Sequence, residues 1–81
     1  MDIRNMLLSG RYTEAVARYG KDAVCDEIGE MAYHDLADKA LYAAEALGYS
    51  GMAKLAAIII VRSGGYSDEA HQLAGKYCSR K

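Results

Sequence analysis

A histidine among acidic residues is the pattern in this chain that comes nearest to a chemical site. Glu30, His34 and Asp38 are four residues apart, so on a continuous helix they would share one face, with Glu27 beside them. Carboxylates raise the pKa of a neighbouring histidine and can ligate a transition metal together with it. A solvated acidic helix face has the same spacing, and neither cysteine adds ligand geometry. We therefore expect no metal here.

The other nucleophiles and bases form no catalytic arrangement. His71 and Cys78 are seven residues apart, which places them on one helix face but about 10 Å apart along the axis, too far for a catalytic dyad. Cys25 and Cys78 match neither a metal-binding nor a redox spacing, so we expect two free thiols. The chain is not expected to be an enzyme, to carry a cofactor or to bind a small-molecule substrate.

Acidic residues are concentrated in the middle of the chain. Residues 22–45 contain seven acidic side chains and one lysine, a net charge of −6 within a chain of net charge −1. Such a segment is either a solvated helix face or a surface that meets a basic protein partner. Tyrosine, the only aromatic residue type present, supports a binding role because it is enriched at interfaces. The candidate partner-binding residues are Asp22, Asp26, Glu27, Glu30, Asp35, Asp38 and Tyr33.

The composition predicts an all-α fold that positions these residues. The 81 residues include fourteen alanines and no proline, and alanine has the highest helix propensity and lets helix axes approach closely. We expect a single helical domain, residues 1–81, built as a compact bundle of five or six short helices. No apolar run reaches the roughly 20 residues that span a bilayer, and the N-terminus does not read as a signal peptide, so a cytoplasmic protein is expected.

Glycines and hydroxyl residues mark the expected helix ends. Thr13 is predicted to cap the second helix and Ser67 the sixth. The acidic segment is too long for one straight helix in a domain of this size, so we expect a break at "YHDLAD", with Asp35 as the cap of the next helix; Gly29 is a second candidate for the break. The expected helices span residues 2–8, the residues from the Thr13 cap to Tyr19, two helices within residues 22–47, residues 51–63, and residues 68 to about 77.

The run Ile58–Val61 is either a buried strand or the middle of an apolar helix. No second β-branched run exists to pair with it, and its flanks are rich in alanine, so we expect a helix over residues 51–63. Ile59 is predicted to face the core. A helix that is apolar all round must be surrounded, so we expect residues 51–63 to form the central helix of the bundle; the alternative is that Ile58 and Val61 face outward as an oligomer interface.

Two alternatives belong to other functional classes. Residues 40–63 could form the helix-turn-helix of a small transcriptional regulator, although its second helix would offer few basic side chains and a pI of about 6.1 gives weak attraction to phosphates. The chain could also be a homo-oligomeric structural module, a homodimer built on Ile58 and Val61. Neither nucleic acid nor a membrane is the expected partner.

In its size, helical composition and acidic content the chain resembles, in type, the small phage-encoded inhibitors of host defence, of which the anti-CRISPR proteins are the best-known group. That group has no common motif, so the resemblance rests on no single residue. It implies a protein-binding inhibitor that acts by occlusion in the host cytoplasm. The acidic helix and neighbouring tyrosines would then cover a basic, nucleic-acid-binding surface of a host effector such as a CRISPR–Cas component.

Overall fold

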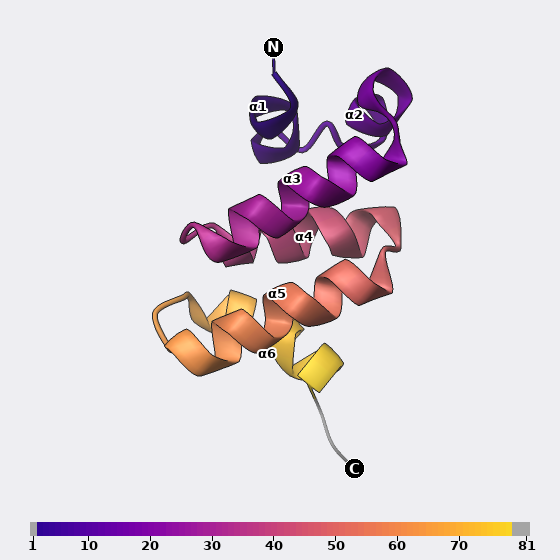
Figure 1. Ribbon diagram of the computed structural model, residues 1–81. Helices are drawn as coiled ribbons and strands as arrows, with labels where there is room; N and C mark the ends of the chain where they lie inside the picture. Colours follow the sequence, from indigo (N-terminus) through magenta and orange to yellow (C-terminus); the bar gives the residue numbers. More distant parts are fainter. Residues whose placement is uncertain (1, 79–81) are drawn as a thin grey trace.

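The computed structural model describes residues 2–78, which form six α-helices and no strand (Figure 1). The predicted all-α fold is therefore confirmed, and Ile58–Val61 lies inside a helix. Within the described part of the chain, no helix is long and apolar enough to cross a bilayer. The helices are α1 (Ile3–Leu8), α2 (Tyr12–Tyr19), α3 (Lys21–Tyr33), α4 (Ala37–Leu47), α5 (Ser50–Ser63) and α6 (Asp68–Cys78).

Helix α4 packs against each of the other five helices. Helices α3 and α5 lie side by side in front of α4, α6 lies behind α5, and α1 and α2 lie at the α3 end of the stack (Figure 1). Helix α5 is covered by α3, α4 and α6 but is open along one side, where Ile58 is 40 % and Val61 49 % exposed. Helix α5 is thus buried on the sides that face α3, α4 and α6 and exposed to solvent on the remaining side.

Alanine dominates the core. Among the described residues, eleven of the eighteen buried hydrophobic side chains are alanines, and most of them lie on α4 and α5. Small side chains let these two helices approach closely. Ile60 is fully buried, and Ile59 is half-buried and packed against the core. Ile59 thus lies on the core side of α5, as expected, but Ile60 is the more deeply buried of the two. The larger fully buried side chains are Met6, Leu7, Val24, Ile28, Met31, Leu41 and Ile60.

The acidic segment breaks within "YHDLAD", as expected, but by a different mechanism. Asp35 is not the cap of α4; it adopts a left-handed conformation with φ of 67° just after α3 ends. The N–H of Leu36 then donates to the carbonyl of Met31 at 2.9 Å, which closes the end of α3 as a Schellman motif. Leu36 itself precedes α4 and offers no side-chain cap. Gly48, with φ of 74°, ends α4 in the same way.

Of the three predicted caps, Thr13, Asp35 and Ser67, only Ser67 caps its helix in the structure. The Ser67 hydroxyl accepts from the N–H of Ala70 at 3.2 Å, so this cap of α6 is confirmed. Thr13 does not cap α2, because it lies inside the helix. The N-cap position of α2 is occupied by Arg11, whose side chain makes no capping hydrogen bond. Asp2 caps α1 by accepting from the N–H of Asn5 at 2.9 Å.

Candidate protein-binding faces

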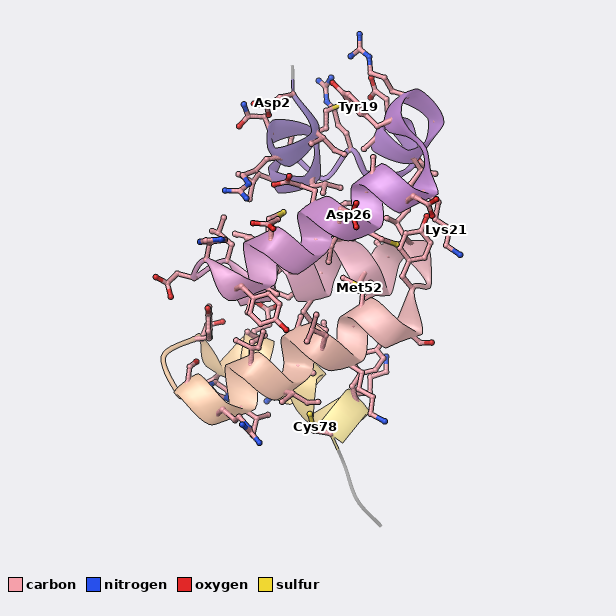
Figure 2. The ribbon with its side chains drawn as sticks, viewed as in Figure 1. Asp2, Tyr19, Lys21, Asp26, Met52 and Cys78 are labelled. Atoms are coloured by element: carbon pink, nitrogen blue, oxygen red, sulfur yellow. The ribbon has the colours of Figure 1, made fainter. Side chains whose placement is uncertain are left out.

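Helix α3 carries its acidic stripe directly opposite its buried side. Val24 and Ile28 are fully buried against the rest of the molecule, while Asp22, Asp26 and Glu30 are exposed. Residues on an α-helix advance by 100° each, so the three carboxylates fall within 80° of one another on the outer side. In Figure 2 the Asp26 side chain lies over the outer surface of α3. The predicted stripe is therefore one continuous surface.

These carboxylates are little neutralised by the protein itself. Neither Asp22 nor Asp26 forms an ion pair with any residue that the structure describes. Glu30 lies 3.2 Å from Nε2 of His34, but both side chains are more than 60 % exposed, and a pair of this kind contributes little. The stripe thus keeps its negative charge available to a partner.

An exposed aromatic ring extends the stripe. Tyr33 is 68 % exposed, and it lies eleven residues, or about three turns, after Asp22, which places it on the same side of α3. Such a ring adds apolar contact area next to the charges and is typical of interfaces. We refer to Asp22, Asp26, Glu30 and Tyr33 as the acidic face.

The other three predicted residues lie outside the acidic face. Glu27 turns toward α1, where its carboxylate accepts from Nε of Arg4, and its side chain is only 18 % exposed, so it holds α1 to α3. Asp35 belongs to the left-handed turn after α3. Asp38, in the first turn of α4, is half-buried and accepts from the N–H of Lys39 at 2.8 Å.

The histidine and its acidic neighbours are divided by the helix break. His34 is the residue after the last turn of α3, and Asp38 belongs to α4. Glu30, His34 and Asp38 are each four residues apart in the sequence, but they do not lie on one helix and so do not share one helix face. Residues 2–78 contain no group of three or more histidine, cysteine or acidic side chains arranged to hold a metal ion. Both cysteines are free and half-buried.

A second exposed face lies on α5. Ile58 and Val61 are open to solvent, and the exposed side chains of Lys54 and Arg62 lie on the same side of the helix. We refer to these four residues as the basic-apolar face. The sequence pattern indicated the two apolar members as a possible interface. Lys54 and Arg62, each four residues from Ile58, were not among the candidate site residues.

The region considered for a helix-turn-helix is an αα-hairpin. Helix α5 returns alongside α4 after Gly48 and Tyr49 (Figure 1), and the two helices together carry seven of the eleven buried alanines among the described residues. A groove of about 360 Å³ lies at the start of α5, lined by Lys21, Cys25, Gly48, Tyr49, Ser50, Gly51 and Met52. Within it the Lys21 ammonium sits 5.2 Å from the centre of the Tyr49 ring.

Comparison with known proteins adds no family to these observations. No protein-family model matches the sequence, and no curated protein or solved structure matches it either. The functional argument therefore depends on the two faces of α3 and α5.

Proposed function

We propose that the protein is a non-enzymatic binding module whose acidic face docks on a basic surface of another protein. The observation that carries this proposal is the alignment of three little-neutralised carboxylates and an exposed tyrosine on the outer side of α3. A basic partner surface is complementary to this row in charge, and unlike charges accelerate association and fix the register of the complex.

The finer form of the proposal is inhibition by occlusion. Basic protein surfaces commonly hold nucleic-acid phosphates, and the row from Asp22 to Glu30 places negative charges about 6 Å apart over roughly 12 Å, one helical turn per step. A linear negative array of this kind can take the place of phosphates on such a surface. The target class we propose is a nucleic-acid-binding host effector, such as a CRISPR–Cas component.

The experiment that tests the docking step compares two triple charge reversals. In the first variant Asp22, Asp26 and Glu30 are changed to Lys; in the control, Glu14, Asp68 and Glu69, exposed acids of α2 and α6, are changed to Lys. Each variant is used as bait in a host lysate, captured proteins are identified by mass spectrometry, and affinity is then measured for the protein recovered with wild type. Thermal unfolding checks that both variants fold.

We expect the acidic-face variant to lose at least about tenfold in affinity and the control to retain binding, because like charges at an interface are strongly unfavourable. Association should also slow as salt rises and the Debye length falls below about 10 Å. Equal binding by both variants, or an affinity that does not change with salt concentration, would exclude docking through α3.

Occlusion is tested separately from docking. Labelled nucleic acid is titrated onto the captured effector with and without this protein, and a gel or fluorescence-anisotropy assay shows whether the two ligands exclude each other. Mutual exclusion is the expected result. A stable ternary complex would leave the docking proposal intact but contradict occlusion.

A further inference from the structure

Part of the exposed side of α5 points away from α3. Met52 of α5 faces α3, because its Cε lies 3.4 Å from the place a Cβ would take on Gly29, and Figure 2 shows Met52 between the two helices. At 100° per residue, Lys54 and Val61 lie about 160° and 180° around α5 from Met52. The side of α5 that carries Lys54 and Val61 is therefore remote from α3, and a neighbour can cover it without covering the acidic face.

Apolar side chains are uncovered on both faces. Ile58 and Val61 on α5 are 40 % and 49 % exposed, and Tyr33 on α3 is 68 % exposed. Exposed apolar side chains that lie beside charged ones are typical of surfaces that another protein covers. An occupant of α5 must bring apolar area for Ile58 and Val61. It must also bring negative charge, because Lys54 and Arg62 lie on the same side of the helix.

The acidic face of a second copy supplies both in a matching spacing. Asp26 and Tyr33 are seven residues apart on α3, and Lys54 and Val61 are seven residues apart on α5. Seven residues return a helix to nearly the same angle, about 10 Å further along its axis. When α3 of one copy lies parallel to α5 of another, Asp26 can meet Lys54 in the same register in which Tyr33 meets Val61. One alignment therefore forms a charge pair and an apolar pair together.

We propose that the protein assembles head to tail, with the acidic face of each copy docked on the basic-apolar face of the next. Lys54 then pairs with carboxylates of the acidic face. The Tyr33 ring covers the two aliphatic side chains of α5 and lies next to the Arg62 guanidinium, a group that aromatic rings attract. The two sides of this contact are different surfaces, so each copy still has one free face after pairing, and a third copy can join.

Other arrangements of the same two helices are less favourable. Reversing the direction of α3 places the Asp26 carboxylate against Val61, where it loses water without gaining a partner. Placing α5 antiparallel on α5 brings Lys54 of one copy to Arg62 of the other, and placing α3 on α3 brings two rows of carboxylates together. Like charges at an interface are strongly unfavourable. The parallel contact between α3 and α5 joins unlike charges and apolar groups at once.

The size of the contact limits its strength. Each copy contributes one helix, of 13 residues in α3 and 14 in α5, so each side of the contact is about 20 Å long and about 10 Å wide. This is small beside the standard interface, which takes about 800 Å² from each partner. Salt also screens exposed charges. We therefore expect reversible assembly, with a dissociation constant of about 0.1–1 mM for each contact and tighter association at low salt.

Assembly and the proposed docking on a basic partner use the same acidic face. A copy whose acidic face lies on its neighbour cannot engage a basic protein, so a free copy, or the copy at one end of an open assembly, is the binding form. A basic partner that binds more tightly than a second copy therefore breaks the assembly apart. Dilution or added salt has the same effect on the assembly.

The test uses two variants, each of which loses one face by substitution of exposed side chains. The α3 variant carries Asp22→Asn, Asp26→Asn and Tyr33→Ser; the α5 variant carries Lys54→Gln and Val61→Ser. Sedimentation equilibrium at low salt gives the mean mass of wild type over a concentration series, of each variant alone and of their equimolar mixture. Thermal unfolding checks that both variants fold.

The mass of wild type should rise past that of a dimer as concentration increases. A control with Glu14→Gln and Arg18→Gln, which removes one charge of each sign from the exposed side of α2, should behave like wild type. Each face variant alone should associate at least about tenfold more weakly. Their mixture should form a dimer and nothing larger, because only one intact contact remains: α3 of the α5 variant on α5 of the α3 variant.

Several results overturn the proposal. One is a wild type that stays monomeric up to millimolar concentration at low salt, and another is a wild-type mass that stops at that of a dimer. A mixture that associates no better than the separate variants contradicts pairing between unlike faces. Self-association that survives in either variant alone also contradicts it; survival in the α3 variant only would place α5 on α5.

Partner binding is measured on the α5 variant to keep the two proposals apart. That variant retains the whole acidic face, so it should bind a basic protein partner at least as well as wild type although it no longer assembles alone. If assembly follows the predicted pattern but the triple charge reversal on α3 leaves partner binding unchanged, the docking proposal alone fails. If that reversal abolishes partner binding but wild type stays monomeric, the assembly proposal alone fails.

Discussion

Asp35 holds a backbone position that suits glycine better than any residue with a side chain. Its φ of 67° is left-handed, and the turn after α3 requires that conformation because the N–H of Leu36 must reach the carbonyl of Met31. Aspartate tolerates the left-handed region better than most residues but still at some strain, which glycine avoids. The residue thus lowers stability at the very point where the acidic segment turns.

Replacing Asp35 with glycine relieves a left-handed strain of about 1–2 kcal/mol and adds about 0.5–1 kcal/mol of chain entropy lost on folding, so the protein should gain up to about 1 kcal/mol in urea-induced unfolding. Asp38→Gly is the matched control, since Asp38 lies three residues later in a right-handed helix, where glycine is unfavourable, so stability should fall by about 0.5–1 kcal/mol. Both changes remove one negative charge, but the charge of Asp38 also stabilises the first turn of α4. Asp35→Ala is therefore the second control: it removes the charge of Asp35 and keeps the left-handed strain, so a gain at Asp35→Gly that is absent from Asp35→Ala isolates the backbone conformation. A loss of stability in both variants would mean that Asp35 is not left-handed in solution.

Three consecutive isoleucines on α5 provide a graded test of which side of that helix is buried. Ile60 is fully buried, Ile59 half-buried and Ile58 40 % exposed. Truncation to alanine should cost about 2–5 kcal/mol at Ile60, less at Ile59, and under about 1 kcal/mol at Ile58. Chemical denaturation of the three variants measures the order. A greater loss of stability at Ile59 than at Ile60 would mean that Ile59 is the more deeply buried of the two, in contradiction to the structure.

At the scale of the elements, α4 is the helix that all the others contact, and four of its residues are buried alanines. Ala44 is fully buried, whereas Ala46, on the same helix, is exposed. A leucine at Ala44 has no room and should destabilise the protein by about 1–3 kcal/mol, because overpacking forces side chains and backbone to shift. Ala46→Leu should leave stability within about 0.5 kcal/mol. Thermal unfolding of the two variants checks this prediction.

Residue types and their spacing predicted where the helices lie but not, in every case, which side of a helix is buried. Glycines and alanines located all six helices to within one or two residues, because propensity and capping act over a few neighbouring positions. Ile59 rather than Ile60 was expected to be the core isoleucine of α5, because a helix apolar on every side has no polar stripe to fix its rotation closely. The Asp35 turn was placed correctly but explained wrongly, since aspartate suits both a helix cap and a left-handed turn.

The candidate faces were predictable only in part, for a similar reason. The exposed positions of Asp22, Asp26 and Glu30 follow from helical spacing alone. Glu27 belongs to the same charge run, yet Arg4 on α1 engages it, and no local pattern records a contact between residues 23 positions apart. The packing of α3 beside α5 on one side of α4 likewise joins segments that are distant in the sequence, and no local pattern records it.

At the scale of the whole molecule, the contacts of α4 predict cooperative unfolding. Every other helix packs on α4, and α6 is additionally held by Glu45 of α4, whose carboxylate accepts from the Tyr77 hydroxyl and from the Lys76 ammonium. We expect far-ultraviolet circular dichroism and tyrosine fluorescence to report one coincident transition in urea, as for a two-state domain. Two separated transitions would divide the chain into independent units and contradict the prediction of one domain.

The alanine core also bears on how stability varies with temperature. An alanine side chain has no rotamers to lose, so the eleven buried alanines among the described residues order themselves without the side-chain entropy that a leucine core gives up. They also remove less apolar surface from water, and it is that surface which makes the heat capacity of unfolding large and the stability curve steep. A fold held by many close contacts between small side chains therefore has a shallow stability curve, and its folded population changes little between cold and warm conditions.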